Sequence, residues 1–183
     1  MKHTVTSATN PSDQARALCE QGNWLDVVGV TLDWQMEQPA DAGAFFFQGV
    51  ALAALGRFSE AETCYRRALQ LDPQDFQIRN HLAELLFGAL SRPVEGAECL
   101  AQALELDAGN QFGWARLAEM YGQLGQPEES LECAERALAL DPEMAEAHLH
   151  RGRAAQILNK PEIVSASSQA LARLPVEKFR RAG

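Results

Sequence analysis

Basic residues are few in this chain of 183 residues, and lysine is nearly missing. Lys and Arg together number 16 against 25 Asp and Glu, which gives a formal net charge of −9. The lysines are Lys2, Lys160 and Lys178, and no basic cluster is longer than Arg180-Arg181. Nucleic acids and anionic membranes attract clustered Lys and Arg. We therefore expect this acidic chain to bind neither of them.

Long apolar runs are also missing. No window reaches the roughly 18 apolar residues that span a bilayer. The first ten residues lack the apolar stretch that a secretory signal requires. We therefore expect no insertion into a membrane and a cytoplasmic location. The hydrophobic content of 46% is nevertheless enough for a full core.

Motifs for catalysis or metal binding are absent from the sequence. The cysteines, Cys19, Cys64, Cys99 and Cys133, form no C-x2-C pair. We find no G-x-S-x-G, no H-E-x2-H, no glycine loop for phosphate and no calcium loop. His148 and His150 are two apart on an expected helix, which places them on different sides of it. We therefore predict a protein that is not an enzyme and that has no cofactor and no metal site.

What the chain does contain is an internal repeat. An Ala-Leu-x-Leu-Asp motif begins at Ala68, Ala103 and Ala137, so its copies lie 35 and 34 residues apart. The pairs Leu55-Gly56 and Leu124-Gly125 lie 69 residues apart, which is about two periods. Periods of this length are typical of stacked helical repeats, which need about three or more copies to be stable.

These repeats resemble the tetratricopeptide repeat, a family with the pattern W-x2-L-G-x2-Y, then A-x3-F, A and P. At the family positions, residues 42–75 carry Phe45, Gly49, Leu52, Ala61, Tyr65, Ala68 and Pro73. Residues 111–144 carry Trp114, Leu117, Ala118, Tyr121, Ser130, Ala134, Ala137 and Pro142. The resemblance implies an all-α fold, a right-handed superhelix of four to five helix–turn–helix repeats with about ten helices.

In this register the repeats lie at 8–41, 42–75, 76–110, 111–144 and 145–174, the first degenerate and the last partial. We expect them to form one domain over 11–174, between a flexible tail at 1–10 and a second tail at 175–183. Repeat 76–110 has one extra residue near Ser91, and Gln48 stands where the family prefers leucine. His148 takes the position that Trp114 has one repeat earlier, so we predict that it packs.

The first repeat is the least regular. Trp34 takes the place of a small residue there, and the run from Val27 to Thr31 is rich in β-formers and could pass for a strand in isolation. We favour a helix because the flanking residues fit the register and because neighbouring repeats override propensity.

The family receives peptides in a concave groove lined by positions 2, 5, 9 and 12 of each first helix. Carried over by position, the groove would present Phe46, Val50, Asn80, Glu84, Phe87, Phe112, Glu119, Leu149 and Arg153. Exposed apolar side chains often mark contact sites. We predict a groove for an apolar segment, helical or extended, with a basic residue against Glu84 and Glu119. The sequence equally allows Phe46 and Phe87 to pack against neighbouring helices.

The resemblance therefore implies a non-catalytic adaptor or scaffold that binds a protein or peptide partner. One alternative is a chaperone of the secretion type, which holds an exported protein. Another is a self-assembling scaffold, a dimer or filament, because the irregular first repeat could leave an imperfect cap. The sequence does not identify the partner.

Overall fold

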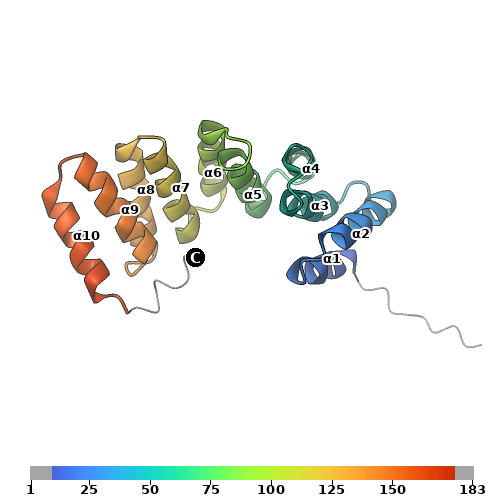
Figure 1. Cartoon of the computed structure of the whole chain (residues 1–183), viewed down its shortest axis with the longest axis horizontal. Coiled ribbons are helices and arrows are strands. Elements are labelled where there is room, and N and C mark those ends of the chain that lie inside the picture. Colours follow the sequence, from blue (N-terminus) through green and yellow to red (C-terminus); the bar gives the residue numbers. More distant parts are fainter. Residues whose placement is uncertain (1–9, 176–183) are drawn as a thin grey trace, which may run out of the picture. The chain divides into compact units, whose positions relative to one another are not determined.

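In the computed structural model, residues 10–175 are described, and all regular structure among them is helical. The helices follow one another along the chain (Figure 1), with the bounds α1 Pro11–Glu20, α2 Trp24–Glu37, α3 Ala42–Ala54, α4 Phe58–Leu71, α5 Phe76–Phe87, α6 Pro93–Leu106, α7 Gln111–Gln123, α8 Pro127–Leu140, α9 Ala145–Ile157 and α10 Pro161–Arg173. The prediction of ten helices without strands is confirmed for this range. Apart from Asn10 and Pro175, the tails predicted at 1–10 and 175–183 lie outside the described residues.

The chain folds as two compact units. The N-terminal unit ends at Leu90 and holds α1 to α5, and the C-terminal unit begins at Ser91 and holds α6 to α10. Their boundary lies in the turn between α5 and α6, inside the repeat predicted at 76–110. The extra residue of that repeat falls in the same turn, where Ser91 has a φ of 52°.

First and second helices of the repeats start in different ways. The side chains of Asn10, Asp41, Asp75 and Asn110 each accept a hydrogen bond from a backbone N–H in the first turn of α1, α3, α5 and α7. Three second helices start with a proline instead, Pro93, Pro127 and Pro161, whose missing N–H needs no partner there. Four first helices thus have a polar cap and three second helices a proline, and α1 has both because it starts at Pro11.

The turns inside the helix pairs need a left-handed residue. Gly22, Gly56 and Gly125 have φ values of 73°, 75° and 72°, and Asn159 takes the same place in the last repeat with φ 57°. Glycine adopts this conformation without steric cost, and asparagine tolerates it better than most other residues. Glycine therefore follows the end of the first helix in three of the repeats, and asparagine does so in the last.

Small residues let paired helices approach closely. A Cβ atom added to Gly49 of α3 would lie 2.6 Å from Cε1 of Tyr65 in α4. Tyr65 is 1% exposed, so its ring cannot move aside into solvent. Likewise, a Cβ atom on Gly43 would lie 3.0 Å from Cη2 of Trp34. The large rings of α2 and α4 are thus accommodated by glycines of α3.

The irregular first repeat folds as a helix pair. The run from Val27 to Thr31 is part of α2, as predicted, and the buried Thr31 hydroxyl donates to the carbonyls of Val27 and Val28 at 2.9 and 3.0 Å. Trp34 is buried with Ala15 of α1 and Ala44 of α3. The large ring at this position therefore fills space between the first two repeats.

Two departures from the repeat pattern have local explanations. The Gln48 side-chain oxygen accepts hydrogen bonds from Gln35 Nε2 at 2.8 Å and from the Cys64 thiol at 3.3 Å, so a polar side chain has partners at a position of leucine. His148 is buried as predicted, and its Nε2 lies 2.9 Å from the Pro142 carbonyl oxygen. Trp114 Nε1 donates to the Ala108 carbonyl at 2.9 Å, also six residues upstream. The histidine therefore replaces both the ring and the hydrogen bond of the tryptophan.

Candidate protein-binding surfaces

The first helices of the C-terminal unit border a cavity. Helices α7 and α9 pack against each other and against α8, and Figure 1 shows them in adjacent helix pairs. A cavity of about 380 Å³ lies on them, lined by Glu119, Gly122, Gln123, Pro127, Ser130, His150, Arg153, Ala154, Gln156 and Ile157. Two residues predicted to line the groove, Glu119 and Arg153, are thus brought to one site.

Three polar side chains of this cavity, Glu119, Gln123 and Ser130, are held by bonds within α7 and α8. Glu119 forms an ion pair with Arg116 and accepts a hydrogen bond from Gln123 Nε2 at 3.1 Å. The buried Ser130 hydroxyl donates to the Ala118 carbonyl at 2.7 Å and ties α8 to α7. Because Arg116 already faces Glu119, the predicted attraction of a basic ligand residue is weakened at this carboxylate. The fixed polar rim favours a ligand that offers its own hydrogen-bonding groups, as a peptide does.

His150 gives the cavity a neutral ring. Burial lowers the pKa of His150, against a smaller opposing effect of Glu119. The imidazole is therefore uncharged at neutral pH and can donate or accept one hydrogen bond at each nitrogen. Sequence reasoning did not single out His150 for the groove, because its position was not among the four carried over from the family.

Large apolar side chains are exposed on the same two helices. Phe112 of α7 is 65% exposed, and Leu149 and Ile157 of α9 are 41% and 67% exposed. Phe112 and Leu149 were predicted to line the groove, whereas Ile157 was not. Apolar side chains that remain in water on a folded helix favour contact with another molecule.

In the N-terminal unit, the predicted groove residues are less accessible. Val50, Asn80, Phe46 and Phe87 are half-buried, and only Glu84 is exposed. The Phe46 ring packs edge-on against Phe47 and His81, with centroid distances of 5.3 and 5.2 Å. It also lies 6.2 Å from the Tyr65 ring. For Phe46, the structure thus shows the packing against neighbouring helices that the sequence left open.

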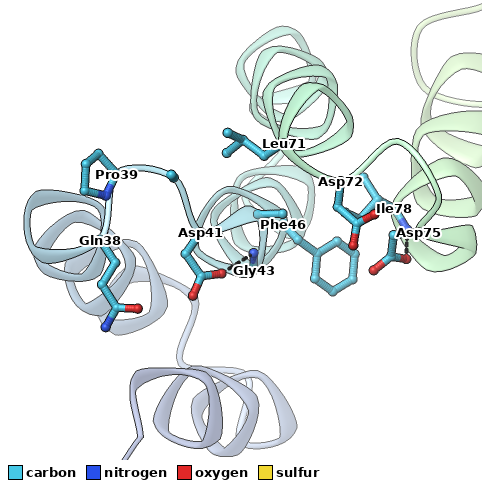
Figure 2. A pocket seen from close by; sticks show the side chains of 11 residues that line it. Gln38, Pro39, Asp41, Gly43, Phe46, Leu71, Asp72, Asp75 and Ile78 are labelled. Carbon is cyan, nitrogen blue, oxygen red and sulfur yellow. Dashed lines mark hydrogen bonds between the residues drawn. The ribbon is translucent and has the colours of Figure 1, made fainter.

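A second cavity opens beside the same phenylalanine, at the loops that lead into α3 and α5. Figure 2 shows Phe46 between the start of α3 and the turn before α5, and the cavity measures about 640 Å³. Its carboxylates are Asp41, Asp72 and Asp75, and no basic residue lines it. Asp41 and Asp75 each use one oxygen to cap a helix, at 2.8 and 3.1 Å from backbone nitrogens. An aromatic ring among carboxylates suits a cation with an apolar stem.

This acidic cavity was not predicted, although its elements are visible in the sequence. Asp72-Pro73 and the capping aspartates recur at the junctions between repeats. Each of these residues on its own is explained as a turn or cap residue. Only the fold brings two successive junctions together beside Phe46.

The described residues form neither a metal site nor a membrane-spanning helix. Within residues 10–175, no group of three or more His, Cys, Asp or Glu side chains is placed to hold a metal ion. The four cysteines, which are all in this range, are free thiols. None of the helices described is both long and apolar enough to cross a membrane.

Comparison with known families places the repeats. The sequence profile of the tetratricopeptide repeat matches residues 42–75 and 112–144. These ranges agree, within one residue, with two of the repeats predicted from the period. A comparison with curated protein sequences gives no match.

Solved structures of the same architecture are similar over nearly the whole chain. A crystal structure of MamA superimposes with a TM-score of 0.77 and 17% identity, over 94% of this chain and 96% of that one. A MamA structure from Desulfovibrio magneticus RS-1, residues 41 to the end, gives 0.76 and 18% identity over 96% and 99%. YrrB, described as a TPR protein with an unusual peptide-binding site, gives 0.74 and 16% identity over 88% and 82%. At these identities the likeness establishes the fold.

Proposed function

Because this chain is a tetratricopeptide-repeat protein, we propose that it is a non-catalytic cytoplasmic adaptor that binds a peptide or protein segment on the first helices of its repeats. The fold is typical of modules that bind proteins. The observation that carries the proposal is the cavity on α7 and α9, with exposed Phe112, Leu149 and Ile157 on the same helices.

The chemistry of this cavity indicates the ligand. Its apolar lining includes Ala154 and Ile157, and its polar side chains include Gln123, Gln156 and the neutral His150. An apolar side chain of the ligand would enter the cavity, while its backbone groups pair with the glutamines at the rim. We infer that the preferred segment carries at least one large apolar residue there.

In the N-terminal unit we propose a separate role for the acidic cavity. A lysine or arginine of the ligand would place its stem against Phe46 and its charge among Asp41, Asp72 and Asp75. Glu84, which is exposed, adds negative charge on α5. The basic residue predicted for the ligand therefore has its best partners here rather than at Glu119.

The test is peptide selection against the immobilised full-length chain, followed by affinity measurements on variants. With Phe112→Ser and Leu149→Ser combined, we expect the selected peptides to bind at least about tenfold more weakly, because central apolar contacts dominate such interfaces. The matched control is Val94→Ser with Leu140→Ser, since these side chains are 58% and 45% exposed on second helices of the same unit. Equal loss in both double variants, or loss in the control alone, would contradict the proposal.

A further inference from the structure

One face of α2 is apolar although it is exposed to solvent. Leu25, Leu32 and Met36 are 73%, 48% and 76% exposed, and Gly29, between them, is exposed as well. Their spacings of four, three and four residues place all of them on one side of the helix. We call Leu25, Gly29, Leu32 and Met36 the apolar α2 face. It lies on a second helix, so it is separate from the surfaces on the first helices.

The repeat itself does not require this face. Val27, Thr31 and Trp34 are the buried side of α2, and they lie on another side of the helix. The positions equivalent to the apolar α2 face are Ser59, Thr63, Arg66 and Gln70 in α4, Glu128, Glu132, Glu135 and Ala139 in α8, and Glu162, Ala166, Gln169 and Arg173 in α10. These twelve side chains are polar, charged or alanine. In α6 the equivalents are Val94, Glu98, Ala101 and Glu105, of which Val94 is the one large apolar residue. A face with three large apolar residues is therefore particular to α2.

A row of carboxylates runs beside the apolar face. Asp26, Asp33 and Glu37 are all exposed, and their spacings of seven and four residues place them together along one edge of the apolar face. The sequence of α2 contains no Lys, Arg or His. A molecule bound on the apolar α2 face would therefore meet negative charge along one side and no positive charge from this helix.

The surface is shaped to receive side chains at one end. A hollow of about 390 Å³ adjoins Leu25 and is lined also by Trp24, Asp26 and Leu55. Farther along the helix, a Cβ atom added to Gly29 would meet nothing within 4 Å, so a partner's backbone can approach closely at that point. The hollow thus suits a large apolar residue, and the glycine suits a close helix crossing.

We propose that the apolar α2 face binds an amphipathic helix of a partner protein, one that carries Lys or Arg along one edge of its apolar stripe. The apolar residues of that helix cover Leu25, Leu32 and Met36, and its basic edge lies against Asp26, Asp33 and Glu37. Charge complementarity decides between this occupant and a second copy of the chain. If two copies of α2 packed antiparallel through their apolar faces, their acidic edges would lie on the same side and repel each other. If the two copies packed parallel, the acidic edges would lie on opposite sides, and neither edge would meet a basic residue of the other α2.

The probe is a monomeric helical peptide with leucines on one face and lysines along one edge, and its twin has glutamates in place of the lysines. We expect the full-length chain to bind the lysine peptide, and the glutamate peptide at least about tenfold more weakly. Leu32→Gln with Met36→Gln should weaken the lysine peptide about tenfold or more, since both side chains lose their apolar contacts. Asp33→Asn with Glu37→Gln should weaken it as well and should flatten its dependence on salt.

A charge-matched control distinguishes binding at the apolar α2 face from a general attraction of the basic peptide to an acidic protein. Glu128→Gln with Glu129→Gln removes two exposed carboxylates from α8, and the affinity for the lysine peptide should stay within about twofold of the parent's. An equal loss in this control would overturn the proposal, as would equal binding of both peptides. Dimerisation of the chain that Leu32→Gln with Met36→Gln abolishes would overturn it in favour of a second copy. Neither outcome bears on the surface of α7 and α9, because that surface is tested with its own peptides and with substitutions at Phe112 and Leu149.

Discussion

The two units use the same repeat but expose apolar side chains on different helices. In the N-terminal unit, Phe46 and Phe47 of the first helix α3 pack against rings from α2, α4 and α5, and the exposed large apolar residues lie on the second helices α2 and α4. In the C-terminal unit they lie on the first helices α7 and α9, beside a cavity, and also on the second helices α6 and α8. The repeat therefore sets the backbone, and the size of the packed side chains decides where apolar surface remains.

Small residues are frequent on the first helices of the C-terminal unit. Ala115, Ala118, Ala147, Ala154 and Ala155 are buried in α7 and α9. The N-terminal unit instead buries the rings of Trp34 and Tyr65 and half-buries Phe46. Around α3, rings from neighbouring helices fill space that alanines occupy less fully on α7 and α9. The cavity beside Phe46 lies at the loops that lead into α3 and α5.

The largest expected effect is the difference in unfolding free energy between two single substitutions of phenylalanine by alanine, one in each unit. Phe46→Ala should lower the free energy of unfolding by about 2 kcal/mol, less than the roughly 3–5 kcal/mol of a fully buried ring, because Phe46 is half-buried. Phe112→Ala should change it by less than about 0.5 kcal/mol, since that ring is 65% exposed. Urea unfolding followed by circular dichroism measures both. Equal losses would mean that the two rings are packed alike and that the units do not differ as described.

A smaller effect is expected where α3 meets α4. Gly49→Ala would place a Cβ atom 2.6 Å from the Tyr65 ring. We expect a net loss of about 1 kcal/mol in the free energy of unfolding, since overpacking exceeds the gain of alanine over glycine in a helix. Gly29→Ala is the matched control, because its Cβ atom meets nothing within 4 Å. It should raise the free energy of unfolding by about 0.5–1 kcal/mol. A gain at both sites would show that α3 and α4 can separate without cost.

Much of this fold follows from the sequence, because each feature depends on neighbours within one repeat. The left-handed glycines such as Gly56 and the prolines that open second helices are local requirements of the backbone. The caps at Asp41 and Asp75 are equally local but were not predicted. The helix at Val27–Thr31 is predicted correctly because the register of the flanking residues outweighs β propensity.

The surfaces depend on side chains from different repeats, and sequence reasoning placed them less well. Position alone puts Phe46 on an outward face, but His81 of the next first helix packs against its ring at 5.2 Å. In α2, both the stripe containing Leu32 and the stripe containing Thr31 have helical spacing, and the sequence does not say which one the neighbouring helices cover. His150 and Ile157 line the cavity from positions that the family pattern did not mark.

The smallest expected effect concerns His81, which lies within the ring cluster of the N-terminal unit. Burial lowers its pKa, against smaller opposing effects of Glu84 and Asp75. Above the ordinary histidine pKa of about 6.5 the ring is neutral in both the folded and the unfolded chain, so it adds no pH dependence there. As pH falls below that value, the unfolded chain takes up a proton that the buried ring resists, and the free energy of unfolding falls until pH passes the lowered pKa. His81→Phe keeps a ring between Phe46 and Tyr65 but removes the group that titrates. Urea unfolding between pH 7.5 and 5, roughly the range in which histidine titrates, should therefore show a smaller decrease in the free energy of unfolding for the variant than for the parent.

Burial also lowers the pKa of His150, which lies in the other unit. His150→Gln should therefore remove a separate part of the slope, and the two losses should add if the units unfold without coupling through these rings.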